Sequence, residues 1–179
     1  MGVPVETADG RLTAGGVTKI VTAEFVRLAN ATAYTALDVV GPNTANPVAL
    51  PFPSCARFAG GTGIIYSALL IDSVDATTNP NFDLVLFDTR TLTVAGDNLI
   101  STITDDEATH CVAAITFNGT DSTNVATVGG NLIIKAINVG QAFKCADGSM
   151  NLWGVVIDRG GYTPASGERF TFKIAILQD

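Results

Sequence analysis

The sequence has few charged residues and no run of basic ones. Charged side chains make up 15% of the 179 residues, and the formal net charge is −7. Without a cluster of Lys or Arg, the chain has no basic surface that could bind along the phosphate backbone of a nucleic acid. The same deficit disfavours docking on an anionic membrane surface. We therefore expect no nucleic-acid partner and no membrane partner.

Long apolar runs are also missing. The longest nearly continuous one, Ile64–Ile71, ends at Asp72 and is far shorter than the roughly 20 residues that span a bilayer. The first ten residues, MGVPVETADG, have neither a basic start nor an apolar centre, so they do not form a secretion signal. We expect a protein that is synthesised in a cytoplasm.

Cysteine and histidine are scarce. Cys55, Cys111 and Cys145 are odd in number, widely spaced and without a CxxC pair, which predicts buried free thiols rather than disulfides or a zinc site. His110 is the only histidine. In an extended strand its neighbour Cys111 points to the opposite face, so a nucleophilic pair is disfavoured and a structural or exposed His110 is expected.

What the sequence does contain is apolar material in short alternating runs. In the closing segment, Phe170, Phe172, Ile174 and Ile176 share one face, while Thr171 and Lys173 lie on the other. Alternation with period two is typical of a half-buried strand. The same reasoning predicts strands at Val17–Arg27, Thr35–Val40, Cys55–Phe58, Gly63–Asp72, Phe82–Asp88, Leu99–Ile103, Val112–Phe117, Leu132–Val139, Gln141–Lys144, Leu152–Asp158 and Phe170–Gln178.

Many short strands joined by turn-rich connectors predict an all-β fold, an antiparallel β-sandwich with very little helix. The one helix candidate is Thr104–Thr109, where Thr104, Asp105 and Asp106 can cap a short turn. Residues 1–16 are Gly-rich with little periodic pattern, which predicts an extended N-terminal arm before a single domain over residues 17–179.

Three predicted strands, Ile64–Ile71, Leu84–Phe87 and Leu132–Val139, are apolar at nearly every position. That composition is typical of strands covered on both faces. We expect the second cover to come either from the domain itself or from a neighbouring molecule.

Two groups of acidic or amide side chains are candidate sites. Asp72, Asp75, Asn79, Asn81 and Asp83 place five oxygen-bearing side chains in one connector, yet the Gly and terminal Glu of a calcium-binding EF-hand are missing. We expect a solvated loop. Asp105, Asp106 and Glu107 could supply a carboxylate pair for glycoside hydrolysis, but at a helix start they more often stabilise its positive end.

Glycines and aromatics are the remaining candidates. Gly60-Gly61-Thr62-Gly63 precedes a strand rather than opening a helix, which favours a turn over a phosphate cradle. Trp153, Tyr34, Tyr66 and Tyr162 could line a sugar-binding face, although Trp153 and Tyr66 lie in apolar strands and are predicted to pack in the core. The residues therefore predict no catalytic, cofactor-binding or metal site, and no enzyme.

Several segments together resemble head-associated structural proteins of tailed bacteriophages, of the decoration or cement type. They are Tyr34–Gly41 (YTALDVVG), Ala56–Gly63 (ARFAGGTG) before a strand ending at Asp72, Leu84–Asp88 (LVLFD), and Leu152–Val155 (LWGV) continuing through Tyr162–Ser166 to Asp179. The resemblance covers residues 17–179. In the family pattern a Gly precedes the Asp at position 38. This chain departs from the pattern there, because it has Leu37 in place of the Gly.

The resemblance implies a jelly-roll-like subunit that binds the major capsid protein on the outside of an assembled head, as a homotrimer and without a cofactor. It implies a location on the capsid surface of the virion. Alternatives remain open: a phage tail or fibre-base subunit has the same sequence features, a non-catalytic carbohydrate-binding module needs exposed aromatics on one face, and an enzyme needs a site built around His110 or Asp106.

Overall fold

The computed structural model describes residues 16–42, 45, 48–74, 79–124 and 132–179. Within these ranges nearly all regular structure is antiparallel β-strand, and helix is limited to α1 (Asp105–Ala108) and a 3-10 turn at Gly119–Asp121. The predicted all-β sandwich with very little helix is confirmed. The predicted arm over residues 1–16 lies outside the described residues, except for Gly16.

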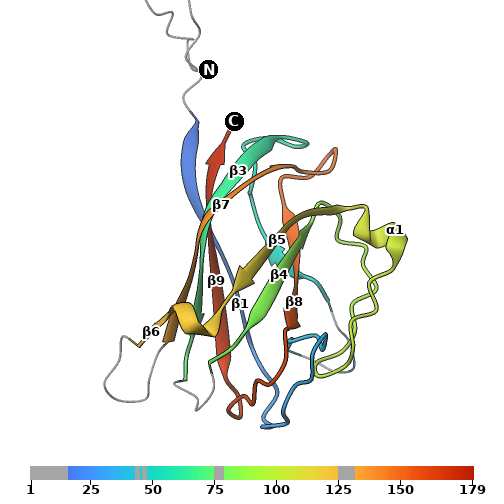
Figure 1. Ribbon diagram of the computed structural model, residues 1–179. Helices are drawn as coiled ribbons and strands as arrows, with labels where there is room; N and C mark the ends of the chain where they lie inside the picture. Colours follow the sequence, from blue (N-terminus) through green and yellow to red (C-terminus); the bar gives the residue numbers. More distant parts are fainter. Residues whose placement is uncertain (1–15, 43–44, 46–47, 75–78, 125–131) are drawn as a thin grey trace, which may run out of the picture.

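The described strands form two sheets that face each other (Figure 1). The five-stranded sheet has the order β1 (Val17–Val26), β9 (Arg169–Gln178), β3 (Thr62–Asp72), β7 (Leu132–Lys144), β6 (Ser122–Asn124). The four-stranded sheet has the order β2 (Leu50–Phe52), β8 (Leu152–Asp158), β4 (Phe82–Phe87), β5 (Cys111–Phe117).

The strand pairing is that of a jelly roll. β1 pairs with β9, β2 with β8, β3 with β7, and β4 with β5, so the chain forms one long antiparallel ribbon closed by the β4–β5 hairpin. Folding this ribbon over on itself creates the remaining pairs, β3 with β9 and β4 with β8. Two sheets connected in this way are a jelly roll. β6 is added outside β7.

Alternating side chains of the strands fill the space between the sheets. The inward residues of β9, predicted from their spacing, are all buried: Phe170, Phe172, Ile174 and Ile176. Phe170 packs edge-on against Phe82 of the opposite sheet, with ring centroids 5.2 Å apart, and Phe172 packs in the same way against Phe117 at 5.7 Å. These aromatic contacts join the two sheets.

The outer face of the four-stranded sheet is covered by the chain itself. A second apolar cluster joins Phe87 and Val155 of this sheet to Val39, Ala49 and Ala95 of the long connectors. The expectation that Leu84–Phe87 is covered on both faces is therefore confirmed, and the cover comes from the same molecule.

The outer face of β3 differs. Ile64 and Tyr66 are 40% and 42% exposed in the monomer, so the expected second cover is absent there. The side chains of residues 135–138, in the third predicted two-faced strand, lie outside the described residues.

Two predicted strands are replaced by bends and isolated bridges. In Thr35–Val40, Leu37 has a positive φ of 75°, which breaks an extended path, and only Asp38 and Val39 make single bridges. In Leu99–Ile103, only Ile100 does so, opposite Asp38. Apolar composition alone therefore predicted strands where the chain makes bridged loops.

The predicted strand Cys55–Phe58 is a turn, and the strand of this region lies upstream, at Leu50–Phe52. Pro51 is typical of a connector rather than of a strand. Proline is tolerated at the edge of a sheet because no ladder hydrogen bond is required on the free side, and β2 is an edge strand.

Leu132–Val139 and Gln141–Lys144 were predicted as two strands and form one, β7. Gly140 has a positive φ of 62°, and the register between β3 and β7 shifts between Ile65 and Ser67. A β-bulge thus carries the strand past the glycine that suggested a break. β6 was not predicted.

Candidate functional site

The outward face of the five-stranded sheet carries the largest feature that the fold leaves unexplained. Its upper half, at the end where β1 begins and β9 finishes (Figure 1), presents apolar side chains from three adjacent strands. We call this surface the upper sheet face and define it by Ile20 of β1, Ile64 and Tyr66 of β3, and Ala175 and Leu177 of β9.

Strand register brings these residues together. Leu177 lies directly between Thr18 of β1 and Ile64 of β3, and Ala175 lies opposite Ile20. Tyr66 occupies the bulge between Ile65 and Ser67, where β3 changes register. The exposed fractions are 64% for Ile20, 42% for Tyr66, 40% for Ile64 and 38% for Leu177. Contiguous apolar exposure of this kind is typical of an interaction surface.

On β1 and β9, the charged side chains of this face lie on its lower half. Lys173 lies opposite Thr22, and Thr171 lies opposite Glu24, to which its hydroxyl donates a hydrogen bond at 3.3 Å. Farther down, Val26 lies opposite Arg169. On β1 and β9, this face is therefore divided into an apolar upper half and a mixed, charged lower half.

A buried ionic cluster stabilises the connectors at the lower end. The Arg27 guanidinium donates to Asp97 Oδ2 at 2.9 Å and also bonds the Tyr34 hydroxyl, and both ionic side chains are almost fully buried. Asp97 Oδ1 further accepts from Tyr34 Oη at 2.5 Å and from Gly41 N at 3.0 Å. Burial is the main cause that raises the pKa of Tyr34. Every group here has a partner within the protein, which indicates a structural role.

An apolar cavity of about 230 Å³ lies where β1 meets the edge of the other sheet. Phe25, Val40, Leu50, Val94 and Val156 are among its lining residues. It contains neither a nucleophile nor a pair of polar groups that converge on one point, so its chemistry supports packing rather than catalysis.

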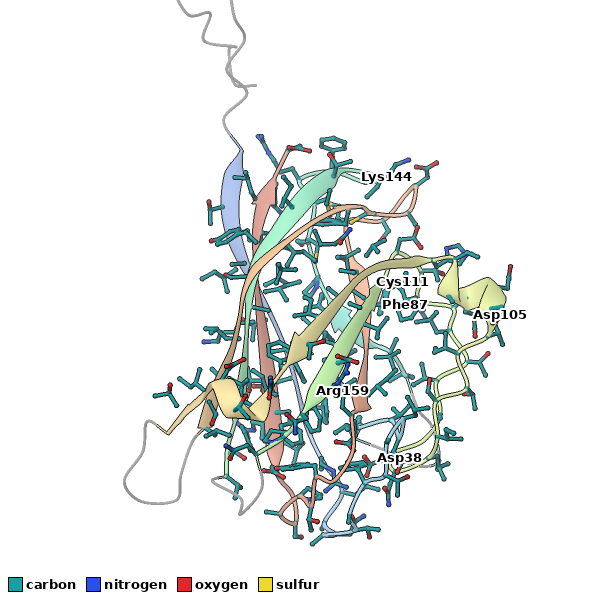
Figure 2. All side chains as sticks on the ribbon, viewed as in Figure 1. Asp38, Phe87, Asp105, Cys111, Lys144 and Arg159 are labelled. Atoms are coloured by element: carbon teal, nitrogen blue, oxygen red, sulfur yellow. The ribbon has the colours of Figure 1, made fainter. Side chains whose placement is uncertain are left out.

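His110 and Cys111 do not form a nucleophilic pair. His110 is exposed, and its Nδ1 lies 2.9 Å from Asp88 Oδ1. Cys111 opens β5 beside Phe87 (Figure 2), and its thiol donates to the Ala113 carbonyl at 3.7 Å. Burial raises the pKa of the Cys111 thiol, which disfavours the reactive thiolate.

The prediction of three buried thiols is wrong for one of them. Cys55 and Cys145 are buried, whereas Cys111 is exposed, because it lies at the start of an edge strand. Burial raises the pKa to about 12 for Cys55 and to about 11 for Cys145. All three cysteines are free.

The candidate calcium ligands do not converge. Asp72 is buried in the sandwich, Asp83 pairs with Arg159 at 2.7 Å, and Asn79 donates to the Gly119 carbonyl at 3.0 Å. Asn81 accepts from Gly119 N, and Asp75 lies outside the described residues. Among the residues that the structure describes, no group of three or more His, Cys, Asp or Glu side chains could hold a metal ion.

The acidic cluster caps a helix, as predicted. The Thr104 hydroxyl accepts from Glu107 N, while Glu107 Oε2 accepts from Thr104 N, which together form a capping box on α1. Hydrogen bonds to its carboxylate, first the one from Thr104 N and next those from Thr93, lower the pKa of Glu107 to about 2. Gly60 and Gly61 likewise lie in the predicted turn, with Gly60 at a positive φ of 71° and Gly61 N donating to the Phe58 carbonyl, while Thr62 and Gly63 begin β3.

The four aromatics are not gathered on one face. Tyr34 and Tyr162 are buried. Tyr66 was predicted to be in the core but is exposed on β3, whereas Trp153 lies half-buried on the other sheet, with the Arg90 guanidinium 5.9 Å from its ring centre. A sugar-binding platform needs neighbouring aromatics, so this arrangement disfavours one.

Sequence reasoning did not identify the upper sheet face. The sequence feature that could have indicated it is the apolar character of positions 64 and 66, which point outward from the sheet. Only the pairing of β3 with β9 and of β9 with β1 shows that Ile20 and Leu177 complete the surface. In the described part of the chain, no helix is long and apolar enough to cross a membrane.

Neither a family model nor a curated protein matches the chain. Among solved structures, it is similar to a chain of the capsid of Ralstonia phage GP4, with 17% identity, a TM-score of 0.42, and coverage of 93% of this chain and 88% of that one. It is also similar to a chain of the cyanophage Pam1 capsid asymmetric unit, with 13% identity, a TM-score of 0.38, and coverage of 98% of both chains.

A third similar chain belongs to the acidic stable capsid structure of Helicobacter pylori bacteriophage KHP30, with 9% identity, a TM-score of 0.32, and coverage of 92% of this chain and 90% of that one. At TM-scores of 0.42 or lower, these similarities do not indicate the function of the chain.

Proposed function

We propose that the chain is a structural protein of a bacteriophage virion, and specifically a decoration protein that binds the outside of the assembled head. The upper sheet face carries this proposal. It is an exposed apolar surface on one sheet, whereas connectors of the same chain cover the outer face of the other sheet. The sequence resemblance to phage decoration proteins supplies the partner, the major capsid protein.

The proposed mechanism is physical rather than chemical. DNA packed inside a head pushes the shell outward, and a subunit that bridges neighbouring capsid proteins adds interface that must be broken before the shell opens. A specific interface buries about 1,600 Å² in total. Many copies acting together give strong retention even where each contact is weak. A trimer of this chain, as the resemblance implies, would place three such faces around one axis.

Immunogold labelling of intact virions tests the location. Gold spread over the head is the expected result. Gold confined to the tail would replace the proposal with the tail or fibre-base subunit, and no labelling would remove a virion role.

A matched pair of variants tests the surface. Ile20→Asp places a charge in the upper sheet face, whereas Val26→Asp changes an equally apolar, exposed residue of the same strand, roughly 20 Å away at 3.3 Å per residue. We expect Ile20→Asp to abolish binding to undecorated heads in a sedimentation assay and Val26→Asp to bind like the wild type. Wild-type binding by a folded Ile20→Asp protein would show that this face is not the contact.

A further inference from the structure

The lower end of the sandwich buries more acid than base. Asp38, Asp72, Asp97, Asp158 and Glu168 are buried there, whereas Arg27 is the one buried basic side chain among the described residues. Arg27 is already engaged by Asp97. The other carboxyl groups must be neutralised in another way, because burying an uncompensated charge is costly.

Asp72 and Glu168 meet at one tyrosine hydroxyl. Tyr162 Oη lies 2.6 Å from Glu168 Oε1 and 3.3 Å from Asp72 Oδ2. The two carboxyl groups also lie within hydrogen-bonding reach of each other. Asp72 is the last residue of β3, Glu168 immediately precedes β9, and Tyr162 lies in the loop between β8 and β9. All three side chains are buried, with at most 1% of each residue exposed.

The hydrogen atoms of this group can be counted. The other oxygen of each carboxyl accepts from a backbone amide: Asp72 Oδ1 from Val74 N at 3.0 Å, and Glu168 Oε2 from Ala165 N at 3.0 Å. The tyrosine hydroxyl has one hydrogen, and the shorter contact assigns it to Glu168. Asp72 Oδ2 then faces only oxygen atoms, so one further hydrogen is required to complete the network.

In the described part of the chain, no cationic side chain neutralises Asp72 or Glu168. Among the described residues, no Lys, Arg or His side chain bonds either carboxyl. The backbone amide of Arg27 donates to the Glu168 carbonyl, but its guanidinium is directed to Asp97, Tyr34 and Asn30. Arg169 is exposed, and its amide donates to Ser73 Oγ. The Tyr162 ring packs against the apolar rings of Phe82 and Phe170.

We propose that Asp72 and Glu168 share one proton in the folded protein at neutral pH, and that this proton latches the loop between β8 and β9 to the end of β3. With the proton on Asp72 Oδ2, every oxygen in the group has a partner. Without it, two carboxylates face each other in an apolar site. Burial, together with Glu168, raises the pKa of Asp72 to about 9, in agreement with this count.

The latch holds several segments at once. Tyr34 N donates to the Tyr162 carbonyl, Gly167 N to the Leu28 carbonyl, and Ser73 N to the Arg169 carbonyl. These bonds tie the connector after β1 and the turn after β3 to the same loop. Loss of the shared proton is therefore expected to loosen the lower end first, before the sheets separate.

The test is the pH dependence of unfolding between pH 6.5 and 8.5. A proton held by the folded state and lost by the unfolded one makes the unfolding equilibrium constant rise tenfold per pH unit. We expect Asp72→Asn, which keeps the size of the side chain and supplies a hydrogen-bond donor, to remove that tenfold rise. The measurement is urea unfolding followed by tryptophan fluorescence at each pH.

Two variants serve as controls. Asp83→Asn changes an aspartate paired with Arg159 at the surface, and Asp158→Asn changes a buried aspartate whose pKa burial raises only to about 6. Both should keep the wild-type slope above pH 6.5. A slope in Asp72→Asn that equals the wild-type slope would overturn the proposal.

A second measurement applies to the wild type alone and does not depend on whether a variant folds. Calorimetric unfolding at pH 7.5 in two buffers of different ionisation enthalpy gives the number of protons released. We expect about one proton released, by linkage. Release of none would show that the pair is fully ionised in the folded state and would overturn the proposal.

Discussion

At the scale of single residues, burial separates three chemically identical thiols. Cys111 is exposed at the start of β5, whereas Cys55 and Cys145 lie in the core. We expect a thiol reagent such as a maleimide to label one cysteine per folded chain and three in denaturant, counted by mass spectrometry. Because burial raises the pKa of Cys111, its labelling should be slower than that of a free thiol. A Cys111→Ser protein that still takes up one label when folded would contradict this assignment.

Burial also distinguishes two ion pairs of similar geometry. Arg27 and Asp97 are almost fully buried, while Lys144 and Asp147 are largely exposed. Asp97→Ala leaves a buried guanidinium without its partner, and we expect it to cost about 3–5 kcal/mol of unfolding free energy. The matched change Asp147→Ala at the surface should have almost no effect. Urea unfolding checks both, and equal effects would show that burial does not govern the pair.

At the scale of strands, close packing of side chains within the four-stranded sheet depends on a glycine in the middle of β8. A Cβ at Gly154 would lie 2.7 Å from Phe52 and 2.9 Å from Leu84. We expect Gly154→Ala to destabilise the protein by about 1–3 kcal/mol, as overpacking does. Gly41→Ala is the control, because a Cβ there meets nothing within 4 Å. Thermal unfolding of both variants tests the contact, and a neutral Gly154→Ala would contradict it.

The strands could be predicted from the sequence wherever apolar and polar side chains alternate along an extended backbone. Alternation located β9 and its buried face, and a threonine before an acidic turn located α1. The pattern failed where one backbone angle decides the outcome: the positive φ of Leu37 ends a run that reads as strand. It also failed for the candidate surface, because Ile20 and Leu177 are 157 positions apart in the sequence and only strand pairing joins them.

At the scale of the whole molecule, buried acids determine how stability responds to pH. Burial is the main cause that raises the folded-state pKa to about 9 for Asp72 and to about 6 for Asp158, against an ordinary value of 3.8. A raised carboxyl pKa stabilises the fold below its ordinary value, and that stability is lost as the pH rises through the folded value. Glu107, with its pKa lowered to about 2, acts in the opposite sense below its ordinary value of 4.5.

These signs predict maximum stability near the ordinary carboxyl pKa values, at about pH 4, with a decline above that pH. A series of thermal melts from pH 3 to pH 9 checks this, with the highest Tm expected at about pH 4. Asp158→Asn should flatten the decline between pH 4 and pH 6 and leave the decline above pH 7 in place. A maximum at pH 8 would show that these carboxyl groups do not control the response.

The pairing of the first and last described strands has a mechanical consequence. Val17 lies opposite Gln178, so β1 begins where β9 finishes, and their ladder runs from there to the pair Val26 and Arg169. A force that pulls residues 17 and 178 apart therefore breaks the hydrogen-bonded pairs of β1 and β9 one after another. A force between residue 17 and the lower end of β9 would instead shear the two strands and load all of these pairs at once. The same domain is thus soft to tension at one pair of attachment points and stiff at the other.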